Sequence, residues 1–150
     1  MCFSIDITPV AKVTWDDAVE IAEQTSVGGR ILVTPRERGR IAPLLGFERK
    51  CRAWSITEDG GCACSLLGYE FVRDPLVPWP LMPDALGPLE MCLRRIADRL
   101  EASFIYLSTF GGDPPSGEER VTLEEMIALV RRNAVADKRY WVSTDSVAAS

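Results

Sequence analysis

Three of the five cysteines lie close together in the sequence, and they are the residues best suited to chemistry. One residue separates Cys62 from Cys64, and Cys51 precedes this pair. Thiolates at this spacing could bind zinc or copper, or cycle between thiol and disulfide. Structural zinc usually needs paired Cys-x-x-Cys or histidine ligands, and the chain has neither. We therefore favour buried thiols without a metal, and keep a thiol-dependent metal or redox protein as the alternative.

Other catalytic arrangements find little support in the sequence. The chain contains no histidine, which removes the usual general base at neutral pH. The acidic pairs Asp16-Asp17, Glu118-Glu119 and Glu124-Glu125 are expected at helix starts, where they favour the helix dipole. Cys2 could act as an N-terminal nucleophile that uses its own amino group as base. We predict a protein without catalytic residues or a cofactor, with hydrolysis by Cys2 left open.

A central β-hairpin over about residues 52–67 is predicted to position the thiols. Trp54 and Ile56 alternate with smaller residues, and an Asp-Gly-Gly turn follows. A three-residue loop pairs Glu58 with Cys62, Ile56 with Cys64 and Trp54 with Leu66. A two-residue loop would instead turn both thiols away from Trp54. We favour the three-residue loop because it places all the apolar side chains on one face.

The remaining elements are read from apolar periodicity and from capping residues. Strands are predicted at Phe3 to Ile7, Arg30 to Thr34, Ser103 to Phe110 and Tyr140 to Ser143, with a turn at Pro35 to Gly39 and an edge segment at Ile41 to Leu45. The first helix has Thr14 as its N-cap and a buried stripe of Trp15, Ala18, Val19 and Ala22, and ends at Gly28-Gly29. The second is capped by Asp84 and buries Leu89, Cys92, Leu93, Ile96 and Leu100. The third starts with a Thr122/Glu125 capping box and buries Leu123, Met126, Ile127 and Val130.

This order of elements predicts an α+β fold. We expect one domain over residues 1–143, with a mixed, mainly antiparallel sheet and three helices packed mainly on one face. Residues 144–150 are expected to form a flexible tail. The length of 150 residues suits a single core.

Charge and aromatic residues indicate where a partner could bind. Residues 28–52 hold seven basic and two acidic residues, although the chain carries a net charge of −5. Arg36, Arg38 and Arg40 are predicted to lie on a loop, where they could grip a carboxylate-rich or phosphate-bearing partner. The proline-rich segment 74–88 carries Trp79, and tryptophan is enriched at binding hot spots. We predict Arg36, Arg38, Arg40 and Trp79 as partner-binding residues.

The composition also indicates where in the cell such binding would occur. No apolar run approaches the ~20 residues needed to span a bilayer, and no signal-peptide pattern begins the chain. Five cysteines without framework spacing suit a reducing cytoplasm. The acidic balance argues against nucleic-acid binding and favours a basic protein partner. We therefore predict a small acidic cytoplasmic domain that binds another protein, of an inhibitor or immunity-like kind.

Overall fold

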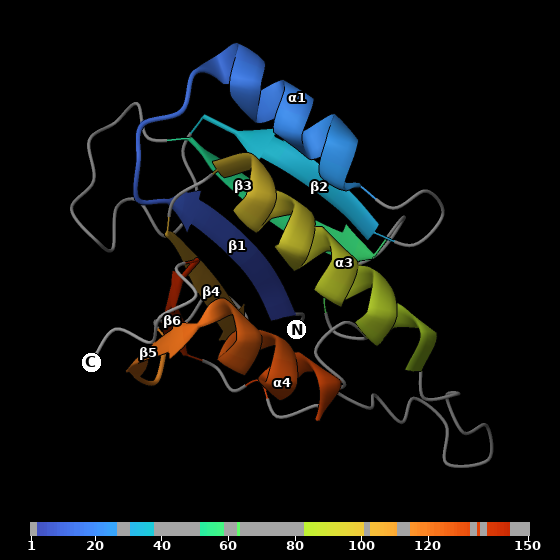
Figure 1. Ribbon diagram of the computed structural model, residues 1–150, viewed down its shortest axis with the longest axis vertical. Coiled ribbons are helices and arrows are strands. Elements are labelled where there is room, and N and C mark those ends of the chain that lie inside the picture. Colours follow the sequence, from blue (N-terminus) through green and yellow to red (C-terminus); the bar gives the residue numbers. More distant parts are fainter. Residues whose placement is uncertain are drawn as a thin grey trace.

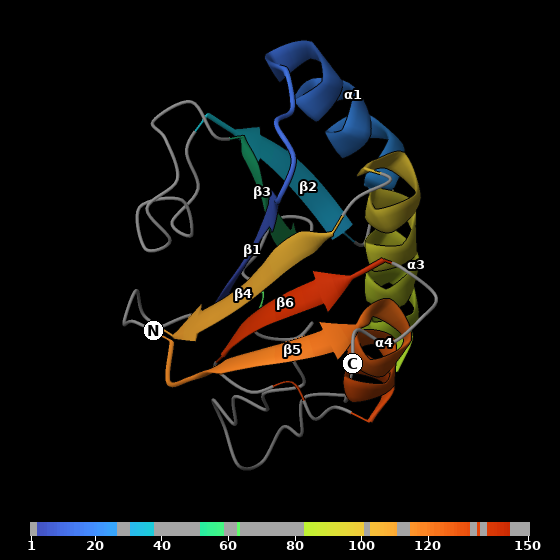
Figure 2. The ribbon, with the colours of Figure 1, turned by 60° about the vertical axis from the view of Figure 1, so that its left-hand side comes forward.

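Six strands form one mixed sheet, and three helices of the described chain cover one of its faces (Figures 1 and 2). The computed structural model describes residues 3–26, 31–37, 52–58, 63, 83–100, 103–110, 115–132, 135 and 138–144. In chain order the elements are β1 (Phe3–Pro9), α1 (Trp15–Thr25), β2 (Ile31–Arg36), β3 (Ala53–Glu58), α3 (Pro83–Leu100), β4 (Phe104–Phe110), β5 (Glu118–Thr122), α4 (Leu123–Arg131) and β6 (Arg139–Ser143). The strand order is β2-β3-β1-β4-β6-β5. The β5–β6 pair is parallel and the other neighbours are antiparallel. The predicted α+β class and the one-sided helix layer are confirmed.

The main core lies between the sheet and the helix layer. Alternation along the strands sends Ile5 and Ile7 of β1 to this side, beside their register partners Ile56 and Trp54 of β3. Trp54 is fully buried, and its indole Nε1–H donates to the Ala18 carbonyl of α1 at 2.9 Å. The predicted stripe of α3 is confirmed, because Leu89, Cys92, Leu93 and Ile96 are all buried in this core.

Local capping signals fix where two helices begin. The Thr14 Oγ1 accepts a hydrogen bond from the Asp17 backbone N–H at 3.2 Å, which starts α1. The Thr122 Oγ1 accepts from the Glu125 backbone N–H at 3.1 Å, which starts α4. Each cap satisfies a backbone donor that the first helical turn leaves without an intrahelical partner. The N-caps predicted at Thr14 and Thr122 are confirmed.

The second face of the sheet carries a smaller apolar cluster. Ile105 and Leu107 of β4 are buried there, and Trp141 of β6 packs against them. The other side of β4 sends Phe104 and Tyr106 into the main core. β4 is therefore buried on both faces, as is typical of a strand whose residues are bulky on both sides.

One end of the sheet gathers the segments that form the candidate sites. From the strand pairing, β1, β2, β5 and β6 all finish at this end, while β3 and β4 begin there. The amino termini of α1 and α4 lie at the same end, because each helix follows directly on β1 or β5. Figure 2 shows the β5 and β6 arrowheads reaching this end beside the start of α4.

The pairing predicted for the central hairpin is not supported. β3 confirms its first strand, but one edge of β3 bonds to β1 and the other to β2. Residues 54–56 therefore offer no free edge to residues 64–66. Ala63 is buried in the same core as Trp54, whereas the favoured loop placed it on the opposite face. Residues 59–62 and 64–67 lie outside the described part of the chain.

Several element boundaries differ from the sequence-based expectation. Pro35 and Arg36 continue β2 instead of forming a turn, because β2 is an edge strand and tolerates a missing N–H. α3 begins at Pro83, so Asp84 lies inside the helix and is not its cap. Proline suits a first helical position, where its N–H would have no intrahelical partner.

Two further predictions are wrong. Trp15 is 39% exposed and does not belong to the buried stripe of α1. Glu118-Glu119 does not start a helix, because both residues belong to β5, a strand that the sequence did not predict. The predicted helix end at Gly28-Gly29, the edge segment 41–45 and the tail 145–150 lie outside the described residues.

No helix in the described part of the chain is long and apolar enough to cross a membrane.

Candidate binding sites at one end of the sheet

The predicted partner-binding residues are described only at Arg36. Arg36 ends β2, is exposed, and lies in register with Ala53 of β3. Arg38, Arg40 and Trp79 lie outside the described residues. The grouping predicted from the sequence therefore stays a prediction.

The cysteine predictions are tested only at Cys92. Its thiol is buried in α3, and burial raises its pKa to about 12. A thiol with this pKa is protonated at neutral pH and is a weak nucleophile and metal ligand. Cys2, Cys51, Cys62 and Cys64 lie outside the described residues, within which no cluster of three potential metal ligands occurs.

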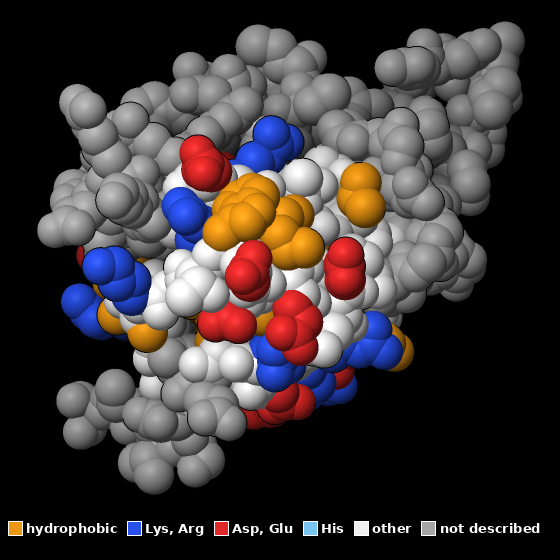
Figure 3. Space-filling view, turned by 90° about the horizontal axis from the view of Figure 1, so that it is seen from above, with side chains coloured by type: hydrophobic (Ala, Val, Ile, Leu, Met, Phe, Trp, Pro, Cys, Tyr) orange, Lys and Arg blue, Asp and Glu red, His pale blue; other side chains and the backbone are white. Residues whose placement is uncertain are grey.

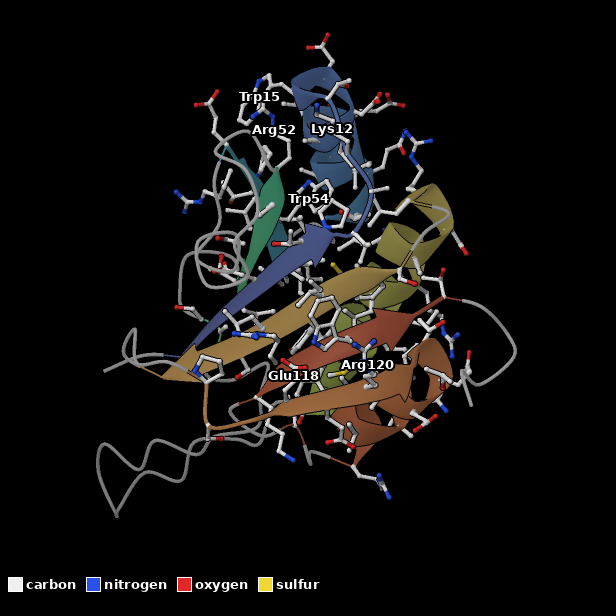
Figure 4. All side chains as sticks on the ribbon, turned by 90° about the vertical axis from the view of Figure 1, so that its left-hand side faces the viewer. Lys12, Trp15, Arg52, Trp54, Glu118 and Arg120 are labelled. Atoms are coloured by element: carbon white, nitrogen blue, oxygen red, sulfur yellow. The ribbon has the colours of Figure 1, made fainter. Side chains whose placement is uncertain are left out.

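An exposed tryptophan marks the first candidate site, which we call the Trp15 surface (Lys12, Trp15 and Arg52). Trp15 is the first residue of α1, where its side chain points toward the helix amino terminus and beyond the core. The Arg52 guanidinium carbon lies 5.4 Å from the Trp15 ring centroid, a cation–π contact. Figure 4 shows Lys12, Trp15 and Arg52 together where α1 begins.

The Trp15 surface carries charges of both signs at its rim. Lys12 is exposed and makes no ion pair with the described residues, and Arg36 lies on the neighbouring strand. Asp16 and Asp17 follow Trp15 in the first turn of α1. Figure 3, which looks onto this end of the molecule, shows hydrophobic side chains gathered among basic and acidic ones. The arrangement is an apolar centre with a polar rim.

A pocket of about 310 Å³ forms the second candidate site, which we call the Trp141 pocket. It lies where β5 and β6 end and β4 begins, beside the first turn of α4. Its apolar lining comprises Val10, Phe104, Val121, Trp141 and Val142, and its polar lining comprises Ser103, Arg120, Thr122, Glu125 and Ser143.

The basic residues beside this pocket differ in whether they are paired with a carboxylate. Arg139 of β6 binds Glu118 of β5 at 3.0 Å, and Lys138 binds Glu119 at 3.3 Å. Arg120 has no carboxylate partner in the described chain, and its guanidinium carbon lies 5.2 Å from the Trp141 ring centroid. The Trp141 Nε1–H is buried without an acceptor among the described residues. The Arg120 guanidinium therefore lines the pocket with hydrogen-bonding capacity left.

A third polar cluster joins α3 to α4. The Arg131 guanidinium donates twice to Glu90, at 2.9 Å and 2.5 Å, and Arg94 donates twice to Glu124, at 2.7 Å and 3.2 Å. The hydrogen bond from Arg131 lowers the pKa of Glu90, and the hydrogen bond from Arg94 lowers the pKa of Glu124. Because all four charges are compensated within the cluster, we assign it to helix packing.

A buried carboxylate lies on the sheet face opposite the helices. Asp6 of β1 is 5% exposed, and its Oδ1 accepts a hydrogen bond from the Ser55 Oγ of β3 at 2.9 Å. The two residues are register partners, so the bond crosses directly between adjacent strands. It helps to compensate the cost of burying the carboxylate.

Comparison with known protein families, with curated proteins and with solved structures finds no match to this chain. The function is therefore argued from the sites themselves. Sequence reasoning did not select Lys12, Trp15 and Arg52 of the surface, or Arg120 and Trp141 of the pocket. Alternation of Glu118, Arg120 and Thr122 was a weak sign of a strand with one polar face.

Proposed function

We propose that this protein acts by binding another protein through the Trp15 surface, as a domain of the inhibitor or immunity-like kind. The observation that carries the proposal is the exposed Trp15 ring with the Arg52 guanidinium over it. Tryptophan and arginine are the residue types most enriched at interface hot spots. An exposed pair of this kind is suited to fill a pocket on a partner.

The surroundings of Trp15 support the same conclusion. The ring is held at the start of a capped helix, so little conformational entropy is lost when a partner buries it. Lys12 and Arg36 add positive charge around the ring, in addition to the negative charge of Asp16 and Asp17. The positive groups suit a partner that presents carboxylates to them around an apolar pocket.

The net charge of −5 favours a basic partner, whereas the basic residues near Trp15 favour an acidic one. Net charge acts mainly on the encounter rate, whereas the residues in contact set most of the affinity. We therefore give the contact residues priority and propose an acidic contact patch on the partner. Arg38, Arg40 and Trp79 stay predicted contributors, and the reducing cytoplasm stays the proposed setting because of the cysteine usage.

The test compares partner capture by variants that are matched in exposure. Immobilised wild-type chain, Trp15→Ser, Lys12→Gln and Met91→Ser are exposed to the same cell extract, and each retained protein is purified and its Kd measured. Met91 is the control because it is 45% exposed on α3, outside the Trp15 surface. We expect Trp15→Ser to raise Kd about 30-fold, the ratio for a hot-spot loss of about 2 kcal/mol. Lys12→Gln should raise it less, and Met91→Ser should leave it unchanged.

The proposal is overturned if every retained protein binds Trp15→Ser and Met91→Ser equally well. Thermal unfolding of each variant shows that the comparison concerns folded protein. Loss of binding in both variants would also count against the Trp15 surface, because it would place the contact elsewhere or reflect general damage.

A further inference from the structure

We infer that the Trp141 pocket binds a small organic monocarboxylate with a flat apolar body. This inference does not depend on the proposed protein binding, because the pocket and the Trp15 surface use different tryptophans and arginines. The pocket volume of about 310 Å³ is at the lower end of the range for ligand sites, roughly 300–1,000 Å³. A ligand of few atoms is therefore expected.

The apolar lining is suited to the body of the ligand. Val10 and the Trp141 ring line the pocket with partly exposed apolar side chains, whereas the side chains of Phe104, Val121 and Val142 are almost fully buried in the main core. A flat ring gains contact area against such a lining without needing hydrogen bonds.

Arg120 is suited to the carboxylate. It lines the pocket and has no carboxylate partner among the described residues, unlike Arg139 on the neighbouring strand. The Arg120 guanidinium carbon lies 5.2 Å from the Trp141 ring centroid, so the ring holds the guanidinium beside the pocket. The N–H donors of a guanidinium can bind a carboxylate at two points, and those of Arg120 are not used by a carboxylate of the described chain.

The remaining polar groups favour a single negative charge over two. The hydroxyl-bearing Ser103 and Ser143 offer hydrogen bonds, and the start of α4 adds a weak positive field. Glu125 lies in the same lining and opposes additional negative charge. A monocarboxylate is therefore preferred to inorganic phosphate.

The test follows the Trp141 indole N–H signal in a ¹H–¹⁵N spectrum of the ¹⁵N-labelled full chain, assigned by its loss in Trp141→Phe. Phenylacetate is the probe, and phenylacetamide is its neutral match. We expect phenylacetate to shift the signal saturably below about 10 mM, and phenylacetamide to bind about tenfold more weakly or less.

Matched variants test whether Arg120 binds the carboxylate of phenylacetate. Arg120→Gln should weaken phenylacetate about tenfold, since a charge-assisted contact is lost. Arg95→Gln removes the same charge from an exposed position on α3 outside the pocket and should leave binding unchanged. Glu125→Gln should tighten phenylacetate by about twofold, because a like charge is removed.

Four results would overturn the inference. The first is no shift of the Trp141 signal by phenylacetate, and the second is equal binding of phenylacetamide. The third is undiminished affinity in Arg120→Gln. Stronger binding of inorganic phosphate than of phenylacetate would also contradict it, because the ligand would then be a multiply charged anion.

Discussion

The same pair of residue types, an arginine over a tryptophan, occurs twice at one end of the sheet in opposite surroundings. Trp15 begins a helix and is exposed, with Arg52 over its ring at 5.4 Å. Trp141 lies within β6, is half-buried, and packs on Ile105 and Leu107, with Arg120 at 5.2 Å. The strand order separates Arg52 beside β3 from Arg120 in β5 by four strand spacings, roughly 19 Å.

The difference lies in the surroundings of the pair, and the two proposed roles follow from them. On a helix end, the exposed tryptophan is available to a pocket on another molecule. Beside a hollow at strand ends, the tryptophan forms part of the wall and the arginine lines the hollow. The two proposals above follow from this contrast in shape.

The largest expected difference between the two pairs is in stability. Trp141→Ala should lower the free energy of unfolding by about 2–3 kcal/mol, less than the roughly 3–5 kcal/mol for a fully buried ring. Trp15→Ala should lower it by about 0.5 kcal/mol, as for other exposed positions. Urea unfolding of both variants measures the contrast. Equal losses would show that the two rings do not differ in their structural role.

The ion pairs between arginine and Glu90 provide a contrast to the two arginine–tryptophan pairs, because their contribution to stability depends on pH. The pKa of Glu90 is lowered from 4.5, so its stabilisation is complete above that value and is lost as pH falls through the lowered pKa. Glu90→Gln should cost about 1 kcal/mol near neutral pH, and the cost should shrink below about pH 4.5. The arginine–tryptophan pairs involve no titrating carboxylate, so their contribution should persist there.

Chemical unfolding of wild type and Glu90→Gln between neutral and acidic pH measures this loss. Glu23→Gln serves as control, because Glu23 is an exposed carboxylate on α1 without a partner in the described chain. A cost of Glu90→Gln that does not change with pH would show that packing, and not charge, is responsible.

The smallest expected effect is the coupling within each arginine–tryptophan pair. Double-mutant cycles with Arg52→Gln and Trp15→Leu, and with Arg120→Gln and Trp141→Leu, should each give about 0.5 kcal/mol, the lower range for exposed cation–π contacts. The half-buried Trp141 pair should give the larger value, because its surroundings screen charge less. A larger coupling at Trp15 would reverse the contrast.

The helix starts at Thr14 and Thr122 were predicted correctly from local sequence, unlike the cap predicted at Asp84. Thr14 and Thr122 bond to backbone N–H groups three residues later, so four residues contain the whole signal for a helix start. The periodic stripe of α3 is likewise read within one helix. The same periodicity failed at Trp15, since a first helical residue has no preceding turn to hold its side chain over the core.

Features that depend on distant segments were not predicted. β5 has three charged residues, and among the described strands it pairs only with β6, from which it is separated in the sequence by α4. The Trp141 pocket combines residues near positions 10, 103, 120 and 142, and no local pattern links them. The predicted hairpin failed for a related reason: turn residues suggested a nearby strand as partner, whereas β3 pairs with β1 and β2.

The position of β6 between β4 and β5 has a consequence for the synthesis of the chain. Both neighbours precede β6 in the sequence, so β4 and β5 leave the ribosome before the strand that joins them. Until β6 emerges, β5 has no strand to pair with and one edge of β4 is unpaired, a state prone to association with other chains. Closure of this part of the sheet, and with it assembly of the Trp141 wall, must follow translation of residue 143.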